Sequence, residues 1–158
     1  MADKKTFMIE GAQLIFLNLA GKEGPMNREG DRNFCVILTP ELAEQLINDG
    51  WNVKFLQPRD EGDAETPYIQ VAVSYKNRPP RVILITSASR TQLSDSQVEI
   101  LDYADIETVD LIATGYDWTV GDKSGTKAYL QSMFVTIRED ALERKYRIHE
   151  DPPTVSED

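Results

Sequence analysis

The chain has 158 residues, 41% hydrophobic and 28% charged, which is typical of a folded globular protein and not of a disordered chain. That length is sufficient to bury a hydrophobic core without disulfides or structural metals. No apolar run approaches the roughly 18 residues of a membrane span, and the N-terminus lacks the apolar segment of a signal peptide, so we expect a cytoplasmic protein without a membrane partner.

Cysteine and histidine are too scarce for several kinds of chemistry. Cys35 is the single cysteine, which excludes an internal disulfide and a thiolate zinc site. Its apolar surroundings, NFCVIL, predict a small buried side chain and not a nucleophile. His149 is the single histidine and stands in a polar tail, so neither a catalytic triad nor a two-histidine metal site is expected. No cofactor motif is present, and we expect no cofactor.

The charges are unevenly distributed along the chain. The net charge of -10 argues against nucleic acid, because proteins that bind it usually carry a basic surface. However, residues 76–90 contain four cations and no acid, whereas residues 91–122 contain eight acids and no cation. This segregation is compatible with a locally positive groove on an acidic protein.

Seven segments have the composition or alternation of β-strands, and a bulge is expected at Gly11 in the first of them. They are residues 7–19, 32–38, 52–56, 67–75, 81–86, 108–120 and 126–137, the last two forming a hairpin across GDKSG. A helix is predicted after Thr39, with Pro40 in its first turn, Gly50 as its stop and Leu42, Leu46 and Ile47 as its apolar stripe. Further helices are expected at 94–104, with Val98, Ile100 and Leu101 as the apolar side, and at 139–146.

These elements predict a mostly β protein, because helices do not alternate with strands as they do in parallel βαβ folds. An OB-fold-like Greek-key barrel with extra strands and two or three short helices fits the order best. The expected organisation is a flexible leader (1–6), an OB-fold-like DNA-binding domain (7–147) and a disordered acidic tail (148–158).

The order of several motifs resembles the OB-fold single-stranded DNA-binding proteins of bacteriophages. The resemblance covers roughly residues 8 to 140, and its most specific pieces are NREGDRNF, GWNVK, GYDW and KAYLQ. It implies non-catalytic, largely sequence-independent coating of single-stranded DNA during phage DNA replication or recombination, in the host cell cytoplasm. It also implies that the acidic tail recruits replication or recombination proteins, although this tail lacks the terminal aromatic residue of many such tails and a solubilising role stays open.

Binding of a single strand needs cations for phosphates and flat side chains on which bases stack. The candidate cations are Lys22, Arg28, Arg32, Lys54, Arg78, Arg81 and Lys127. The candidate aromatic residues are Tyr75, Tyr116, Trp118 and Tyr129, with Trp51 as a further one. For Trp51 and Tyr75, packing in the fold is the better interpretation. We expect the loop at 20–31 to form one wall of a groove, opposite the turn at 78–81 and the closing hairpin.

Strand alternation places Lys127, Tyr129 and Gln131 on one face, which we interpret as the DNA face. Met133 and Val135 have the same parity but are apolar. A bulge or a half-buried strand would resolve this conflict.

Two other kinds of function remain open from the sequence. One is a phage structural or assembly β-barrel protein that oligomerises without DNA; homo-oligomers are also compatible with DNA binding. The other is a Mg²⁺-dependent nuclease that uses Asp95, Glu99 and Asp102, which share one side of the expected second helix. A solvated helix face is the preferred interpretation of these acids, because no lysine or histidine stands near them.

Overall fold

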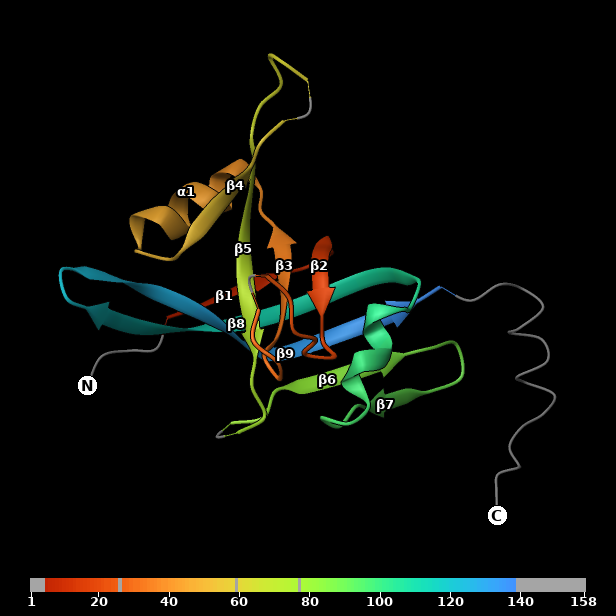
Figure 1. The fold of residues 1–158 in the computed structure, drawn as a ribbon. Coiled ribbons are helices and arrows are strands. Elements are labelled where there is room, and N and C mark those ends of the chain that lie inside the picture. The colour runs from red at the N-terminus through yellow and green to blue at the C-terminus, as the bar shows by residue number, and fades with distance from the viewer. Residues whose placement is uncertain (1–4, 26, 59, 77, 139–158) are drawn as a thin grey trace.

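The computed structural model describes residues 5–25, 27–58, 60–76 and 78–138. The described part contains nine strands, one α-helix and one 3-10 helix (Figure 1). The strands are β1 (Lys5–Ile9), β2 (Leu14–Asn18), β3 (Arg32–Ile37), β4 (Val53–Leu56), β5 (Thr66–Val73), β6 (Arg81–Ile85), β7 (Arg90–Gln92), β8 (Ile106–Val120) and β9 (Lys123–Ile137). The helices are α1 (Pro40–Asn48) and the 3-10 helix η1 (Val98–Asp102).

The strands form one sheet in the order β1-β8-β9-β5-β3-β2. Its pairs are antiparallel except that β9 runs parallel to β5 and to β6. The additional strands β4, β6 and β7 join this path at its sides. The fold is therefore mostly β and OB-fold-like with extra strands, as predicted. The sheet is not closed, because β1 and β2 end the path and do not pair with each other in the described part of the chain.

The segment predicted as one strand at 7–19 is two strands, and the single-strand prediction is wrong. Gly11 has a φ of 66° and turns the chain between β1 and β2, a conformation that glycine adopts without steric cost. Its amide donates to Asp110 Oδ1 at 2.9 Å. After this turn the partner strand changes from β8 to β3. In addition, β1 begins at Lys5, inside the segment expected to be a leader.

The core lies between the inward faces of the long strands. Alternate residues along much of β5, β8 and β9 are buried, as strand geometry requires, whereas β3 buries the three consecutive residues Phe34, Cys35 and Val36. The largest fully buried side chains include Phe34, Ile69, Leu111 and Met133. Cys35 is also buried, in agreement with the prediction from its apolar neighbours.

The helix α1 begins and ends where the sequence predicts. Thr39 Oγ1 accepts a hydrogen bond from the Leu42 amide at 3.2 Å, and Gly50 follows the helix with a φ of 89°. The predicted apolar stripe is wrong in one position, since Ile47 is 46% exposed. Ala43 is buried beside Leu46 instead, because it lies three residues before Leu46 on the side that faces the sheet.

The second predicted helix is much shorter than expected, and the strand β7 before it was not predicted. Within 94–104, only η1 is helical, and it is a 3-10 helix. Its buried residues, Val98 and Leu101, are three apart, which matches three residues per turn, and Ile100 is exposed. The predicted helix at 139–146, the tail and the expected boundary at 147 lie outside the described residues.

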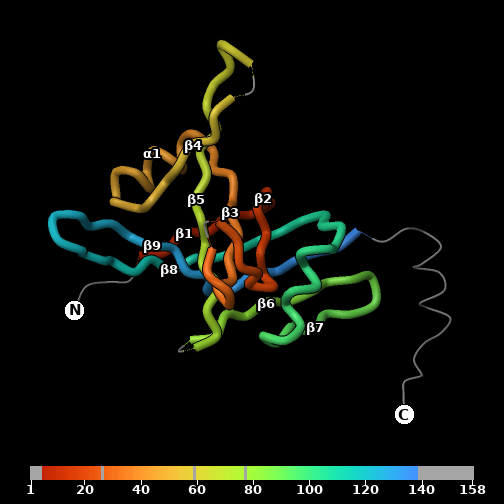
Figure 2. The backbone as a smooth tube through the Cα atoms, in the orientation of Figure 1, coloured from red at the N-terminus to blue at the C-terminus, as the bar shows by residue number. Residues whose placement is uncertain are grey.

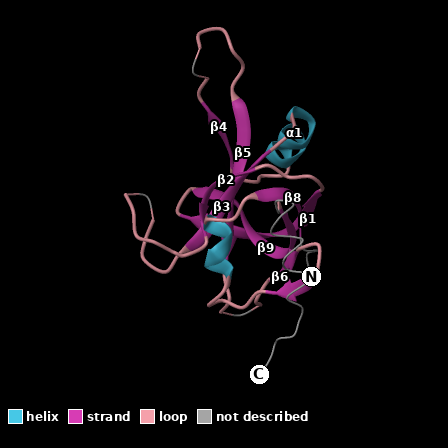
Figure 3. Cartoon of the chain, turned by 90° about the vertical axis from the view of Figure 1, so that its right-hand side faces the viewer, coloured by secondary structure: helices cyan, strands magenta, loops and turns pink. Residues whose placement is uncertain are grey.

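The closing hairpin is the longest feature of the fold. The tube in Figure 2 shows β8 and β9 running together to a tip beyond the rest of the sheet. Their turn is Gly121 and Asp122, shorter than the predicted five-residue connection, so Lys123 to Gly125 extend β9. Figure 3 shows α1 and η1 at separate parts of the sheet. Neither helix in the described part is long and apolar enough to cross a membrane.

Candidate nucleic-acid interface

A groove of about 980 Å³ runs along the base of the β8–β9 hairpin. We call it the hairpin groove. It is lined by Ser74, Lys76, Arg78 and Pro79 after β5, by Thr114, Tyr116, Asp117 and Trp118 of β8, and by Lys127, Tyr129, Leu130 and Gln131 of β9. Five predicted site residues are thus brought together: Arg78, Tyr116, Trp118, Lys127 and Tyr129.

The aromatic side chains of the groove form a compact group with exposed surfaces. The rings of Tyr116 and Tyr129 meet edge to face, with centroids 5.1 Å apart. The ammonium group of Lys127 lies 5.2 Å from the centroid of Tyr129. Tyr116 is 43% exposed and Trp118 is 37% exposed, which is high for large aromatic residues. The groove therefore offers aromatic surface and a cation in one place.

A β-bulge resolves the parity conflict on β9. Ala113 pairs with Leu130, but the preceding residue, Ile112, pairs with Ser132, so β9 contains one extra residue, Gln131. Before the bulge, Lys127 and Tyr129 face the groove. After it, Met133 and Val135 are buried in the core.

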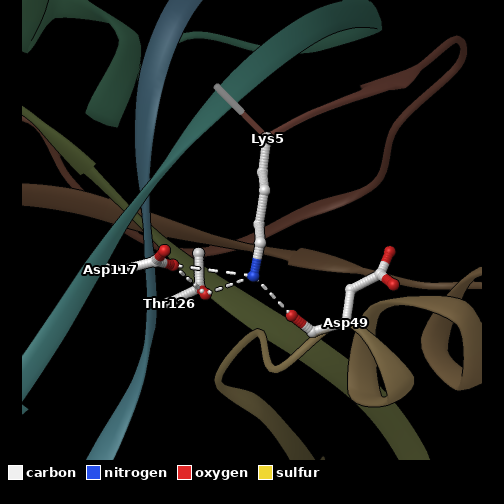
Figure 4. A network of polar contacts seen from close by, with 4 residues as sticks. All are labelled: Lys5, Asp49, Asp117 and Thr126. Atoms are coloured by element: carbon white, nitrogen blue, oxygen red, sulfur yellow. Dashed lines mark hydrogen bonds and ion pairs between the residues drawn. The ribbon is translucent and has the colours of Figure 1, made fainter. Parts of the chain in front are cut away.

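The opposite side of the hairpin is tied to β1 and α1 (Figure 4). Lys5 Nζ donates to the Asp49 carbonyl at 2.7 Å and to Thr126 Oγ1 at 3.2 Å. It also lies 3.6 Å from Asp117 Oδ1. The Thr126 hydroxyl donates to the same carboxylate at 2.7 Å. This hydrogen bond and the charge of Lys5 lower the pKa of Asp117.

Trp51 belongs to the core and not to the groove. It is 5% exposed, and its ring meets Phe7 edge to face with centroids 5.0 Å apart. A Cβ atom on Gly115 would lie only 2.7 Å from Trp51 Cη2, so the indole packs directly against the β8 backbone. Thr126 also exchanges backbone hydrogen bonds with Gly50 and Asn52 on either side of Trp51. Trp51 therefore supports the base of the hairpin from behind.

The loop between β2 and β3 does not line the hairpin groove, although it was expected to form one wall of the groove and its cations were candidates for binding phosphates. Lys22 Nζ donates to Tyr103 Oη at 2.8 Å, and this hydrogen bond raises the pKa of Lys22. The Asp102 carboxylate accepts from the amides of Leu19 and Ala20 at 2.8 and 3.0 Å. Asp102 thus fixes the start of the loop, a structural role that the nuclease hypothesis did not consider.

Arg32 is also used within the fold. Its guanidinium donates to the Asp95 carbonyl at 3.1 Å and lies 5.5 Å from the centroid of Tyr75. Tyr75 is partly buried against the core, and burial raises the pKa of its hydroxyl. By contrast, Arg28 is exposed, and its guanidinium has no hydrogen bond or ion pair to the described residues.

Two predicted cations lie outside the groove on other strands. Lys54 is exposed on β4 and pairs in register with Tyr68. Arg81 is exposed at the start of β6.

Comparison with known proteins places the chain in a family. The family model described as "Putative phage ssDNA-binding domain" matches residues 2–158. The chain belongs to this phage ssDNA-binding domain family.

Among the solved structures similar to this phage ssDNA-binding domain, one with a TM-score above 0.5 supports the fold. The single-stranded DNA-binding protein from bacteriophage Enc34 superimposes with a TM-score of 0.55 at 10% identity, covering 85% of this chain and 82% of that one. Its C-terminal truncation gives a TM-score of 0.49 at 12% identity, with coverages of 85% and 87%. The single-stranded DNA-binding protein gp2.5 of bacteriophage T7 gives 0.43 at 12% identity, with coverages of 98% and 100%. A comparison with curated proteins gave no match.

Sequence reasoning omitted several lining residues of the groove in this phage ssDNA-binding domain. Lys76 is the clearest, since it belongs to the acid-free run at 76–90 and could have been included on that signal. Thr114 carried no comparable signal, whereas Gln131 was expected on the DNA face together with Lys127 and Tyr129. Thr114 and Gln131 become neighbours only through the register of β8 and β9, in which Thr114 Oγ1 donates to Gln131 Oε1 at 2.7 Å.

Proposed function

We propose that this protein binds single-stranded DNA in the hairpin groove, without catalysis and largely independently of sequence, during phage DNA replication or recombination. The observation that carries the proposal is the composition of the groove, in which exposed aromatic rings and cations share one surface. Membership of the phage ssDNA-binding domain family supports it.

The aromatic residues of the groove suit the bases. Tyr116, Trp118 and Tyr129 lie on one side of the hairpin, and each has a ring on which a base can stack. Stacking on such rings contributes about 1 to 3 kcal/mol per base and tolerates any sequence, because every base has an aromatic face.

The cations of the groove suit the phosphates. Lys76 and Arg78 come from the segment after β5 and Lys127 comes from β9, so a backbone in the groove would meet positive charge from two parts of the chain. The side chains of Lys76 and Arg78 make no hydrogen bond or ion pair with the described residues. Their charges are therefore available to an anion. Asp117 also lines the groove, but Lys5 partly compensates its charge from behind.

Fluorescence anisotropy with labelled oligonucleotides tests this function. We expect similar affinities for single strands of thymidine, adenine and mixed sequence, and much weaker competition by a duplex of the same length. A duplex that competes equally, or affinities that depend strongly on sequence, would contradict the proposal. Concentration-dependent oligomers that are unaffected by DNA, seen by light scattering, would instead support the phage assembly hypothesis. Digestion of the oligonucleotide in Mg²⁺ or Mn²⁺ would support the nuclease hypothesis.

The proposal extends to the cellular role. It includes action in the host cytoplasm and recruitment of replication or recombination proteins by the acidic tail, a segment outside the described residues. Pull-down of phage replication proteins by the full chain, compared with a chain ending at residue 147, tests the second part. Equal capture by both chains would contradict it.

A further inference from the structure

Phe16 is an exposed aromatic residue in an unusual backbone conformation. It lies on β2, is 61% exposed and has a φ of 54°. Among the described residues it is the one non-glycine residue with a positive φ. Bulky side chains rarely adopt this conformation, which is more often found at functional sites.

A bulge in β2 accounts for this conformation. Ile15 pairs with Cys35 and Asn18 pairs with Asn33, so β2 has one more residue than β3 over this stretch. The bulge places the Phe16 ring edge to face with the ring of Tyr68, at a centroid distance of 6.1 Å. Two aromatic rings from β2 and β5 thus stand together on the outside of the sheet.

The two rings lie on the same face of the sheet as the hairpin groove. On β5, Ile69 and Val71 point into the core, so Tyr68 and Ala72 point to the other face. Ala72 pairs in register with Tyr129, which lines the hairpin groove. Tyr68 and Ala72 are four residues apart, about 13 Å at about 3.3 Å per residue. The outer face of β5 therefore leads from the groove to Phe16.

Lys54 supplies a cation beside these rings. It pairs in register with Tyr68 and is exposed. Tyr68 pairs with Ile37 of β3 on one edge of β5 and with Lys54 of β4 on the other edge, so Lys54 flanks Tyr68 on the side opposite to β3. Lys54 makes no hydrogen bond or ion pair with the described residues, so its charge is available to a phosphate.

We propose that Phe16, Tyr68 and Lys54 form a second binding station for single-stranded DNA, which holds nucleotides of the same strand that occupies the hairpin groove. This inference rests on the proposed function and adds a position to it. The adjacent cation and the continuity with the groove favour DNA as the occupant over a second copy of the protein. A purely apolar contact between copies would leave Lys54 without a role.

The test compares a short with a long oligonucleotide, of about 4 and about 16 nucleotides, the range of site sizes for one OB-fold. A strand advances about 3.4 Å per stacked nucleotide, so the short one cannot fill the groove and reach across a further 13 Å or so. Phe16→Gly removes the ring and keeps the fold, because glycine adopts a positive φ readily. Ile100→Ala is the matched control, since Ile100 is also exposed and lies on η1.

We expect Phe16→Gly to weaken binding of the long oligonucleotide at least about fivefold, and to leave that of the short one within about twofold. Lys54→Ala should reduce the salt slope by about 0.7 for the long oligonucleotide alone. Wild-type affinity of both variants for the long oligonucleotide would overturn the second station but not the groove. If the wild-type protein binds neither oligonucleotide, the proposed function itself fails. A dimer that Phe16→Gly dissociates, in analytical ultracentrifugation without DNA, would overturn DNA as the occupant.

Discussion

Trp118 on β8 lies over Gly125, its direct partner on β9. A Cβ atom on residue 125 would be 3.1 Å from Cζ2 of the indole and 3.3 Å from its Nε1, so glycine leaves the space that the ring occupies. The backbone of β9 thus supports the indole on one side while 37% of the residue stays exposed. Such a ring is already held in place before DNA arrives, which lowers the entropic cost of binding.

We expect Trp118→Ala to weaken binding of single-stranded DNA by about 1 to 3 kcal/mol at every salt concentration, because stacking is lost and no charge changes. Anisotropy titrations at two salt concentrations measure this effect, and the slope of log affinity against log salt should stay the same. Trp118→Phe is the matched control and should keep most of the affinity. An unchanged affinity of Trp118→Ala would contradict its role.

Lys76→Ala and Arg78→Ala should act differently from Trp118→Ala. Each should reduce the salt slope by about 0.7, the value for one phosphate contact on a single strand. Arg90→Ala is the control, because Arg90 is exposed on β7 over the ring of Phe134 and does not line the groove. An unchanged slope in both groove variants would show that the phosphates lie elsewhere.

Arg32→Ala should reduce stability more than DNA binding. The substitution removes the hydrogen bond to the Asp95 carbonyl and uncovers the ring of Tyr75. We expect a loss of about 1 to 3 kcal/mol in the free energy of unfolding, measured with urea, and an unchanged salt slope. A lower slope of log affinity against log salt, without loss of stability, would instead show that Arg32 contacts the DNA.

Gly115→Ala should destabilise the base of the hairpin. The new methyl group would lie 2.6 Å from Thr126 Cγ2 and 2.7 Å from Trp51 Cη2, both packed positions. We expect a loss of about 1 to 3 kcal/mol in the free energy of unfolding. Gly24→Ala is the control, because Gly24 has open space around its Cα and no positive φ, and its stability should change little. Equal stability of the two variants would contradict the close packing.

Cys35 should be unreactive in the folded protein. Burial disfavours the thiolate and raises the pKa of Cys35 to about 11, so at pH 8 nearly all of the side chain is the thiol. A disulfide reagent such as dithiobisnitrobenzoate should react slowly at pH 8 and rapidly after denaturation. Rapid reaction in the native state would show that the outer face of β3 opens.

Strand positions and helix caps could be predicted from the sequence because they depend on local pattern. The alternation at β5 and the Thr39 cap of α1 are both found as predicted. The two-strand arrangement at 5–18 was missed because its cause is a change of partner from β8 to β3 at Gly11, and partners are not encoded locally. The 3-10 helix η1 was missed because two apolar residues three apart also fit an α-helix.

The groove could be predicted only in part, because strand alternation can be read from the local sequence whereas distant partners cannot. The alternation of the hairpin correctly placed Tyr129 and Lys127 on one face, and of the two explanations left open for Met133 and Val135 the structure shows the bulge, at Gln131. The composition of the loop before β3 suggested free cations, but Lys22 and Arg32 are bound by Tyr103 and by the Asp95 carbonyl. Those partners are more than 60 residues away in the sequence, so no local pattern reveals them.

The salt dependence of single-strand binding by the wild-type protein tests the central claim most directly. An anisotropy titration with a thymidine oligonucleotide of about 16 nucleotides, at about 50 and 200 mM salt, measures it. We predict clear binding at the lower concentration and a slope of log affinity against log salt near −3, about −0.7 for each of Lys76, Arg78, Lys127 and Lys54. No measurable binding at the lower salt concentration would contradict the claim that the hairpin groove holds single-stranded DNA.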